Sequence, residues 1–160
     1  MGGRSFVALH APGHSDGQLI FYAERDGLML SGDHLLNKIT PHIGVWPGSE
    51  PNPLARYLGS LSALAEYSVR LALPGHKTLI HDWRGRIGEL LHHHDERLSA
   101  MRAAVQGGAT AYEVARRVFP FEHYTTHEMR FAVAETIAHL EFLTYDGVVR
   151  RIEGPVVRYE

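Results

Sequence analysis

The 160-residue sequence predicts a mixed α/β fold (α+β) in which a strand-rich part precedes a small helical domain. In the first part, short apolar runs end at glycine or proline, a pattern typical of strands that stop at turns. In the second part, apolar residues recur at intervals of three and four, which indicates amphipathic helices. We therefore expect two domains, residues 1–85 and residues 86–160.

Four strands and one helix are expected in residues 1–85. The dipeptide Asp26-Gly27 separates two apolar runs and predicts a hairpin turn. Leucines at helical spacing follow a group of prolines, which predicts that the helix begins near Leu54. The expected strands are residues 6–10, 19–22, 28–30 and 69–73.

Residues 34–53 are rich in proline and glycine, which predicts a long irregular loop. In a compact domain, a loop of this length is often a lid or a ligand-binding loop. Trp46, Tyr57 and Tyr67 are candidates for the wall of a substrate groove below such a lid. Packing in the core is the simpler interpretation of these aromatic residues.

The order helix, short helix, helix and hairpin is expected in residues 86–160, and it is the order of a winged helix. An apolar stripe over residues 87–105 predicts the first helix. Capping boxes at Thr110-Ala-Tyr-Glu113 and Thr125-Thr-His-Glu128 predict the starts of the next two. The expected hairpin strands are residues 148–152 and 156–159.

The composition excludes several kinds of site. A chain without cysteine cannot form a disulfide, a thiolate metal site or a cysteine nucleophile. Its 12 histidines leave imidazole and carboxylate as candidate metal ligands, which suits zinc, iron or manganese. No apolar run approaches the ~18 residues of a membrane span, and the first residues, MGGRSF, lack the apolar region of a signal peptide. We expect a cytoplasmic protein that does not bind membranes.

Three segments share one pattern, in which an apolar strand runs into a turn of small residues that carries a metal-ligating side chain. The segments are LHAPGHSDG, MLSGDH and ALPGH, and the side chains are His14, Asp33 and His76. Adjacent strand ends can bring these side chains together although 19 and 43 residues separate them along the chain. Two imidazoles and a carboxylate are typical ligands of zinc or non-haem iron.

The run His92-His93-His94 is not expected to chelate one ion. Consecutive residues of a helix point in different directions, so the three imidazoles cannot converge. His94 lies on the apolar stripe and the other two flank it. Packing and surface roles are therefore the favoured interpretation.

The motifs APGHSDG, LMLSGDHLL and LALPGH resemble, in order and approximate spacing, the third, fourth and fifth metal motifs of the metallo-β-lactamase fold superfamily. The segment ITPHIGVWPGSEPNPLARYLGSL resembles the lid and helix of one branch, in which a histidine and an arginine follow the last metal motif. His93 and Arg97 occupy similar places. The resemblance covers essentially the whole chain. It implies the second half of an αββα metallo-β-lactamase sandwich followed by a small helical winged-helix domain.

The resemblance also implies a hydrolase that uses two divalent metal ions, with zinc as the first choice and iron or manganese as alternatives. By motif match, His14 is expected to bind the first ion and His76 the second. Asp33 would bridge the two and is the expected catalytic residue. A hydroxide held by the metals would attack a small-molecule ester or thioester substrate.

Three neighbours of these ligands each have two interpretations. Ser15 and Asp16 either orient a metal ligand or form an ordinary polar turn. His34 follows the bridging aspartate and either contacts substrate or faces solvent.

The superfamily's signature motif, His-x-His-x-Asp-His, does not occur in this sequence. Because that motif supplies further ligands to both ions, we expect this chain to be the C-terminal part of a longer hydrolase, with weak metal binding and no hydrolysis of its own. Half of a sandwich would also expose the inner face of its sheet, an apolar surface that normally marks an interface. The expected partners are the missing N-terminal half or a second copy of the chain in a homodimer.

Two other functions stay open. The substrate could be single-stranded RNA, because related family members act on RNA, or the second domain could be a non-catalytic interaction module. Residues 86–160 carry 9 Lys/Arg and 11 Asp/Glu, and the expected recognition helix carries three glutamates against Arg130. Nucleic-acid binding requires a basic face, so RNA is the less favoured partner.

Overall fold

The computed structural model describes residues 3–160, and the chain forms two compact units. Unit 1 contains Met1–Pro41 and Ala55–His92, and unit 2 contains His42–Leu54 and His93–Glu160. Helix α2 (Trp83–Val105) contributes residues to both units. The predicted mixed α/β class is confirmed, whereas the domain boundary at residue 85 stays a prediction.

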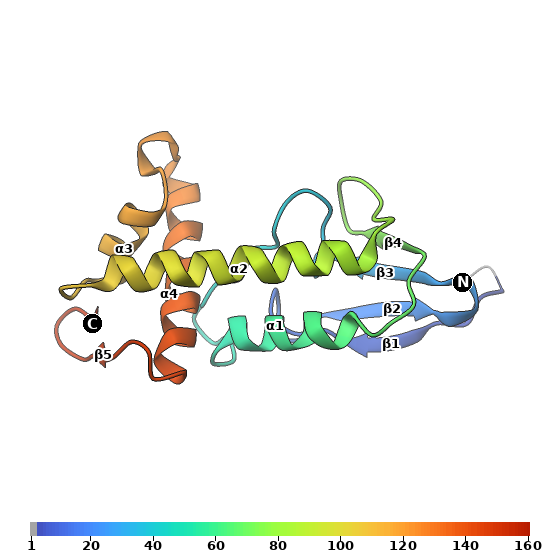
Figure 1. The fold of residues 1–160 in the computed structure, drawn as a ribbon, viewed down its shortest axis with the longest axis horizontal. Coiled ribbons are helices and arrows are strands. Elements are labelled where there is room, and N and C mark those ends of the chain that lie inside the picture. Colours follow the sequence, from blue (N-terminus) through green and yellow to red (C-terminus); the bar gives the residue numbers. More distant parts are fainter. Residues whose placement is uncertain (1–2) are drawn as a thin grey trace. The chain divides into compact units, whose positions relative to one another are not determined.

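Unit 1 is built on a four-stranded sheet (Figure 1). In their order in the sheet, the strands are β1 (Val7–His10), β2 (Leu19–Ala23), β3 (Leu28–Gly32) and β4 (Leu71–Pro74). The first three strands run antiparallel, which confirms the hairpin predicted at Asp26-Gly27. Gly27 has a φ of 58° at this turn, a conformation that glycine adopts at little cost. Strand β4 then joins β3 in parallel.

Helix α1 (Pro53–Leu64) and the first part of α2 cover one face of this sheet. Ile20 and Met29 are fully buried on that face. Ile20 shares it with Tyr22, since alternate residues of a strand point the same way, and Tyr22 is paired with Met29. The indole Nε1 of Trp83 donates a 2.8 Å hydrogen bond to the carbonyl oxygen of Leu64, which ties α2 to the end of α1. The core of unit 1 therefore lies between the sheet and these two helices.

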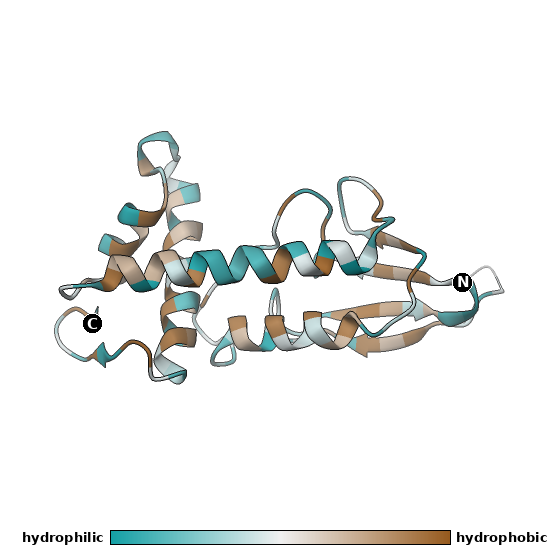
Figure 2. Ribbon diagram, in the orientation of Figure 1, coloured by the Kyte–Doolittle hydropathy of each residue, from teal (hydrophilic) through white to brown (hydrophobic). Residues whose placement is uncertain are grey.

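The opposite face of the sheet is apolar and only partly covered. Leu19 is 50% exposed and Phe21 is 38% exposed. The strand register places Leu30 and Leu73 on the same face, where both are half-buried. Figure 2 shows apolar residues along most of each strand. An apolar face of this kind normally marks an interface.

Unit 2 is mainly helical, and its elements follow the predicted order. Both predicted capping boxes are present, at Thr110 with Glu113 and at Thr125 with Glu128. The assignment of this order to a winged helix stays a prediction. Across residues 3–160, none of the helices combines the length and apolar character that a bilayer span requires. After α2, the elements are α3 (Ala111–Val118), a 3-10 helix (Phe121–His123), α4 (Thr126–Tyr145) and the paired strands β5 (Arg151–Ile152) and β6 (Arg158–Tyr159).

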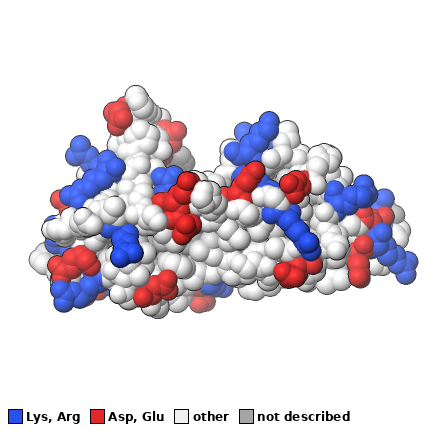
Figure 3. All heavy atoms as spheres, in the orientation of Figure 1, with Lys and Arg blue, Asp and Glu red and all other residues white. Residues whose placement is uncertain are grey.

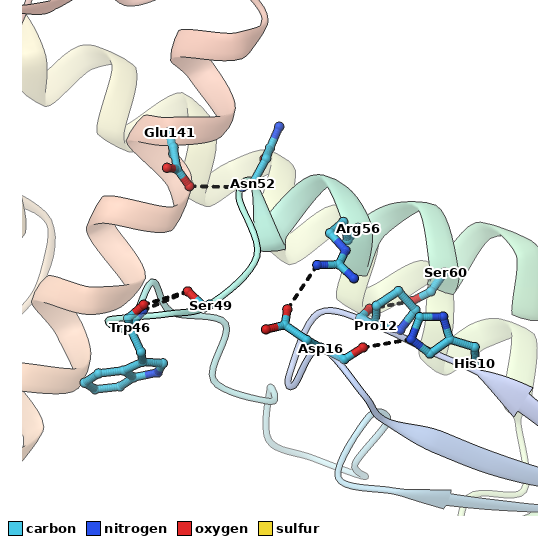
Figure 4. A network of polar contacts seen from close by, with 9 residues as sticks. All are labelled: His10, Pro12, Asp16, Trp46, Ser49, Asn52, Arg56, Ser60 and Glu141. Carbon is cyan, nitrogen blue, oxygen red and sulfur yellow. Dashed lines mark hydrogen bonds and ion pairs between the residues drawn. The ribbon is translucent and has the colours of Figure 1, made fainter.

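The irregular loop predicted over residues 34–53 is present, and its second part packs on α4 within unit 2. The imidazole Nε2 of His42 donates a 2.9 Å hydrogen bond to the Phe131 carbonyl. The backbone N–H of Asn52 donates to a carboxylate oxygen of Glu141 at 3.1 Å (Figure 4). These bonds attach the loop to one helix at both ends of the segment.

A pair of buried imidazoles links α2 and α4 inside unit 2. His139 Nδ1 donates a 2.8 Å hydrogen bond to the Glu135 carbonyl, so its Nε2 is the acceptor for His94 Nδ1 at 3.1 Å. Burial lowers the pKa of His94 to about 3, with smaller contributions from the charges of His139, His93 and Arg97. Burial also lowers the pKa of His139 to about 4. Both rings are therefore neutral at pH 7.

We predict that this pair makes the fold sensitive to acid. In the unfolded chain both histidines bind a proton near pH 6.5, whereas in the folded chain they do so only near pH 3 to 4. The unfolded state therefore binds more protons as the pH falls from about 6.5 towards 4, and the free energy of unfolding decreases by about 1.4 kcal/mol per pH unit for each imidazole. Urea unfolding across this pH range measures the slope.

The variant His139→Gln should reduce this slope, and the matched variant His92→Gln, at an exposed position on α2, should retain it. The comparison between variants is needed because burial raises the pKa of Glu135 to about 7, which contributes a slope of opposite sign. An unchanged slope in His139→Gln would contradict the prediction.

Candidate metal centre

The parallel pairing of β3 and β4 brings two of the three predicted ligands together. Asp33 directly follows β3 and His76 lies two residues beyond β4, so both leave the same edge of the sheet. His76 Nε2 and Asp33 Oδ1 are 3.5 Å apart. Both side chains are almost half exposed, and they remain accessible to a ligand from solution.

Two glycines permit this close approach. Gly32 has a φ of 52°, and its carbonyl accepts a 2.8 Å hydrogen bond from the N–H of Gly75. A Cβ atom on residue 75 would lie 2.4 Å from Asp33 Oδ1, closer than any real contact. Glycine at position 75 is therefore a condition for the Asp33–His76 geometry, which explains the Pro-Gly-His sequence physically.

His14 lies in the turn between β1 and β2, which rests directly on α1. Gly13 has a φ of 136°, and a Cβ atom there would meet the backbone of Tyr57 at 2.6 Å. Glycine therefore allows the turn to touch the helix and places His14 beside it. The structure does not assemble His14, Asp33 and His76 into one cluster: among residues 3–160, no three His, Asp or Glu side chains form a group suited to one ion.

The two polar neighbours of His14 take part in the turn. Asp16 Oδ1 forms a 3.0 Å ion pair with Nη1 of Arg56 on α1, and its carbonyl accepts a 2.7 Å hydrogen bond from His10 Nε2 (Figure 4). The carbonyl of Ser15 accepts from the N–H of Gly13 at 3.3 Å, while the residue itself is exposed. Asp16 thus attaches the His14 turn to α1; a role in orienting a ligand stays a prediction for both.

His34 is fully buried, so the expectation that it faces solvent is wrong. Its Nε2 lies 2.8 Å from Ser60 Oγ on α1, and its carbonyl accepts a 3.1 Å hydrogen bond from the Tyr57 hydroxyl. Burial, with a smaller effect of the neighbouring His14, lowers the pKa of His34 to about 4. His34 is buried because these two hydrogen bonds hold it against α1.

Two residues that the sequence analysis did not single out hold the loop after Asp33. The Asn37 amide donates hydrogen bonds of 2.9 and 2.8 Å to Thr78 Oγ1 and the Leu79 carbonyl, which join this loop to the one that carries His76. Arg86 donates to the carbonyls of Leu36 and Ile39. Asn37 lies in an irregular loop and Arg86 near the start of α2; neither contact follows a local sequence pattern, so only the folded structure identifies them.

His93 and Arg97, which the resemblance singled out, lie on the unit 2 part of α2. The Arg97 guanidinium lies 4.4 Å above the ring of Phe119, and its Nε is 3.9 Å from a carboxylate oxygen of Glu135. Burial raises the pKa of Glu135 to about 7 despite this cation. These contacts account for Arg97 within unit 2.

The donor set at the strand ends fits a divalent metal ion in part. Donor atoms lie about 2.0–2.2 Å from zinc, so two donors on one tetrahedral ion are about 3.3–3.6 Å apart. The Asp33–His76 distance of 3.5 Å agrees with this spacing. Asp33 Oδ1 is also buried without a hydrogen-bond partner among the described residues, an arrangement that a bound cation would satisfy. The described residues therefore place two candidate ligands at the spacing of one site.

Comparison with known proteins identifies the family to which this fold belongs. A family model described as metallo-beta-lactamase superfamily matches residues 1–76, and one described as metallo-beta-lactamase-like, C-terminal domain, matches residues 98–160. The chain belongs to the metallo-β-lactamase superfamily and corresponds to the C-terminal portion of that fold.

Known relatives agree with this membership. A crystal structure of a metallo-beta-lactamase family protein from Thermus thermophilus superposes with a TM-score of 0.89 at 43% identity, covering 98% of this chain and 49% of that one. The "Probable metallo-hydrolase YqjP" of Bacillus subtilis is 27% identical over 95% of this chain and 49% of its own length. The chain thus spans about half the length of these relatives.

A third relative carries a more specific name. The atrochrysone carboxyl ACP thioesterase of Cryptosporiopsis sp. is 31% identical over 85 residues, which are 53% of this chain and 24% of that protein. Together, these matches support membership of the metallo-β-lactamase superfamily.

We predict that Gly75→Ala lowers the affinity for metal more strongly than it lowers the free energy of unfolding. The added Cβ forces Asp33 Oδ1 away from its present position, and a displaced ligand typically costs about tenfold to 100-fold in metal affinity. Titration with cobalt(II), followed by its visible absorption, measures the affinity. Gly88→Ala is the control, because a Cβ there meets nothing within 4 Å. Equal cobalt affinity in both variants would contradict the prediction.

Proposed function

We propose that this chain forms part of the active site of a metal-dependent hydrolase that cleaves an ester or thioester. The observation that carries the proposal is the Asp33–His76 pair at the edge of the sheet, two half-exposed side chains with metal-type donor atoms 3.5 Å apart. Membership of the metallo-β-lactamase superfamily supports the reaction class.

The roles of the residues follow from their positions. Asp33 and His76 would hold one divalent ion between them, and His14 would contribute to a second ion from its own turn. When bound, such ions supply Lewis acidity and lower the pKa of water for hydrolysis. Zinc is our first choice, with iron or manganese as alternatives, because imidazole and carboxylate ligands suit all three.

The ester or thioester preference rests on a relative rather than on a pocket. The thioesterase among the relatives is named for hydrolysis of a thioester bound to an acyl carrier protein. The RNA alternative lacks a basic surface: α4 carries Glu128, Glu135 and Glu141 against Arg130. On the face that Figure 3 shows, Lys and Arg are interspersed with Asp and Glu. A small-molecule ester or thioester is the proposed substrate, in preference to RNA, and the cytoplasm is the proposed location.

The partly exposed face of the sheet supports a protein partner. Leu19 and Phe21 lie on it with Leu30 and Leu73, and burial of such side chains releases free energy in proportion to their apolar area. In a solution of the purified chain, we propose a second copy of the chain as the occupant, because a two-fold dimer would bury this apolar face on both copies at once.

We predict that hydrolysis depends on Asp33 and His76. Because the relatives are about twice as long, the test joins this chain to the half of the Thermus thermophilus protein that it does not cover. The chimera should cleave a thioester such as acetyl coenzyme A, and Asp33→Asn or His76→Gln should lower kcat/KM by about 100-fold or more. The exposed His92→Gln variant is the control. Hydrolysis that survives both ligand substitutions would exclude the proposed site.

We also predict that the purified chain self-associates through its sheet face. Sedimentation should show a mass that rises with concentration towards that of a dimer. Phe21→Arg should yield a monomer, because it places a charge on the apolar face. Tyr112→Arg, at a residue 52% exposed on α3, should leave the dimer intact. A concentration-independent monomer of the unmodified chain would refute the self-association.

A further inference from the structure

We propose that Ser60 and His34 form a positioning pair that couples the turn carrying His14 to the turn carrying Asp33. The inference rests on the proposed function, since it assigns a role to residues around its ligands. Neither residue contacts substrate in this proposal. Their role is to hold two metal-ligand turns at a set separation from one helix.

The hydroxyl of Ser60 stands at the centre of the arrangement. Ser60 Oγ lies 3.2 Å from the Pro12 carbonyl, 2.8 Å from the Tyr57 carbonyl and 2.8 Å from His34 Nε2 (Figure 4 shows the contact with Pro12). A hydroxyl carries one hydrogen and two lone pairs. Its one hydrogen is therefore shared between the Pro12 and Tyr57 carbonyls, and a lone pair accepts from the imidazole, which makes His34 the Nε2–H donor.

This chemistry sets the tautomer of His34. With its proton on Nε2, the ring leaves Nδ1 as a bare acceptor, and Nδ1 is buried without a hydrogen-bond partner among the described residues. Loss of the Ser60 hydroxyl would leave the second ring nitrogen buried and unsatisfied as well. The imidazole is held in place by one strong contact, which makes its position depend on Ser60.

The two ends of the pair lie next to the metal ligands in the sequence. Pro12 is two residues before His14, and His34 directly follows Asp33. Tyr57 reinforces both ends, because its hydroxyl donates to the His34 carbonyl at 3.1 Å and its backbone contacts Gly13. One face of α1 thus holds both turns, and the Ser60 hydroxyl makes polar contacts with both of them.

The pair also explains why a histidine, rather than an apolar residue, follows Asp33. His34 is fully buried, a position that apolar side chains commonly occupy. An apolar side chain could not hydrogen-bond Ser60 Oγ, whereas the imidazole does so and fixes the direction in which the chain leaves Asp33. A purely structural core residue would carry no such directional bond.

The test compares three variants of the full 160-residue chain. Ser60→Ala removes the hydroxyl, Ser60→Thr retains it, and Ser62→Ala removes an exposed hydroxyl of the same helix that bonds only the Leu58 carbonyl. Amide hydrogen exchange without metal is the first readout. In Ser60→Ala, amide exchange should quicken about threefold to tenfold, the effect of one lost hydrogen bond, over residues 13–16 and 32–36 together.

In Ser60→Thr and Ser62→Ala both turns should exchange as in the unmodified chain. Faster exchange in one turn alone, or in neither, would overturn the coupling. This readout uses no metal, so it tests the positioning pair even if the chain binds no metal. Failure to bind metal would count against the proposed function alone.

Cobalt(II) titration is the second readout. Ser60→Ala should bind the ion about tenfold more weakly with an altered visible spectrum, whereas Ser60→Thr and Ser62→Ala should match the unmodified chain. A matching affinity and spectrum in Ser60→Ala would show that the pair does not position the ligands.

Discussion

The parallel pairing of β3 with β4 is the constraint on which the candidate centre depends. Two adjacent parallel strands end at the same edge of a sheet, so the residues that directly follow them lie close together. Asp33 and His76 lie in this geometry. Gly75 permits it because it lacks the Cβ atom that would displace Asp33 Oδ1. The metal-type donors are thus placed by backbone hydrogen bonds, the most rigid framework that the chain has.

Helix α1 is the second framework, and it acts through close contact. Gly13 lets one turn touch the helix backbone, and Arg56 pairs with Asp16 of the same turn. On the other side, the buried His34 attaches the turn after β3. Directional polar contacts at low exposure are costly to break. A small number of them therefore suffices to hold loops that have no regular secondary structure.

The two units use buried polar groups differently. In unit 1 the buried imidazole of His34 bonds a serine beside the candidate centre. In unit 2 the His94–His139 pair and the Arg97–Glu135 pair join α2 to α4, where desolvation favours the neutral forms of His94, His139 and Glu135. The first arrangement orders loops, whereas the second joins helices and couples their packing to pH.

The sequence by itself determined the strands, the helices and two capping boxes, because each depends on periodicity or on residues three positions apart. It also indicated Asp33 and His76 as ligands through the glycines before them. Only the tertiary structure decided which donors meet, that His34 is buried, and that Arg86 and Asn37 hold the loop after Asp33. These contacts join residues 26 to 50 positions apart in the chain, and no local pattern encodes such a pairing.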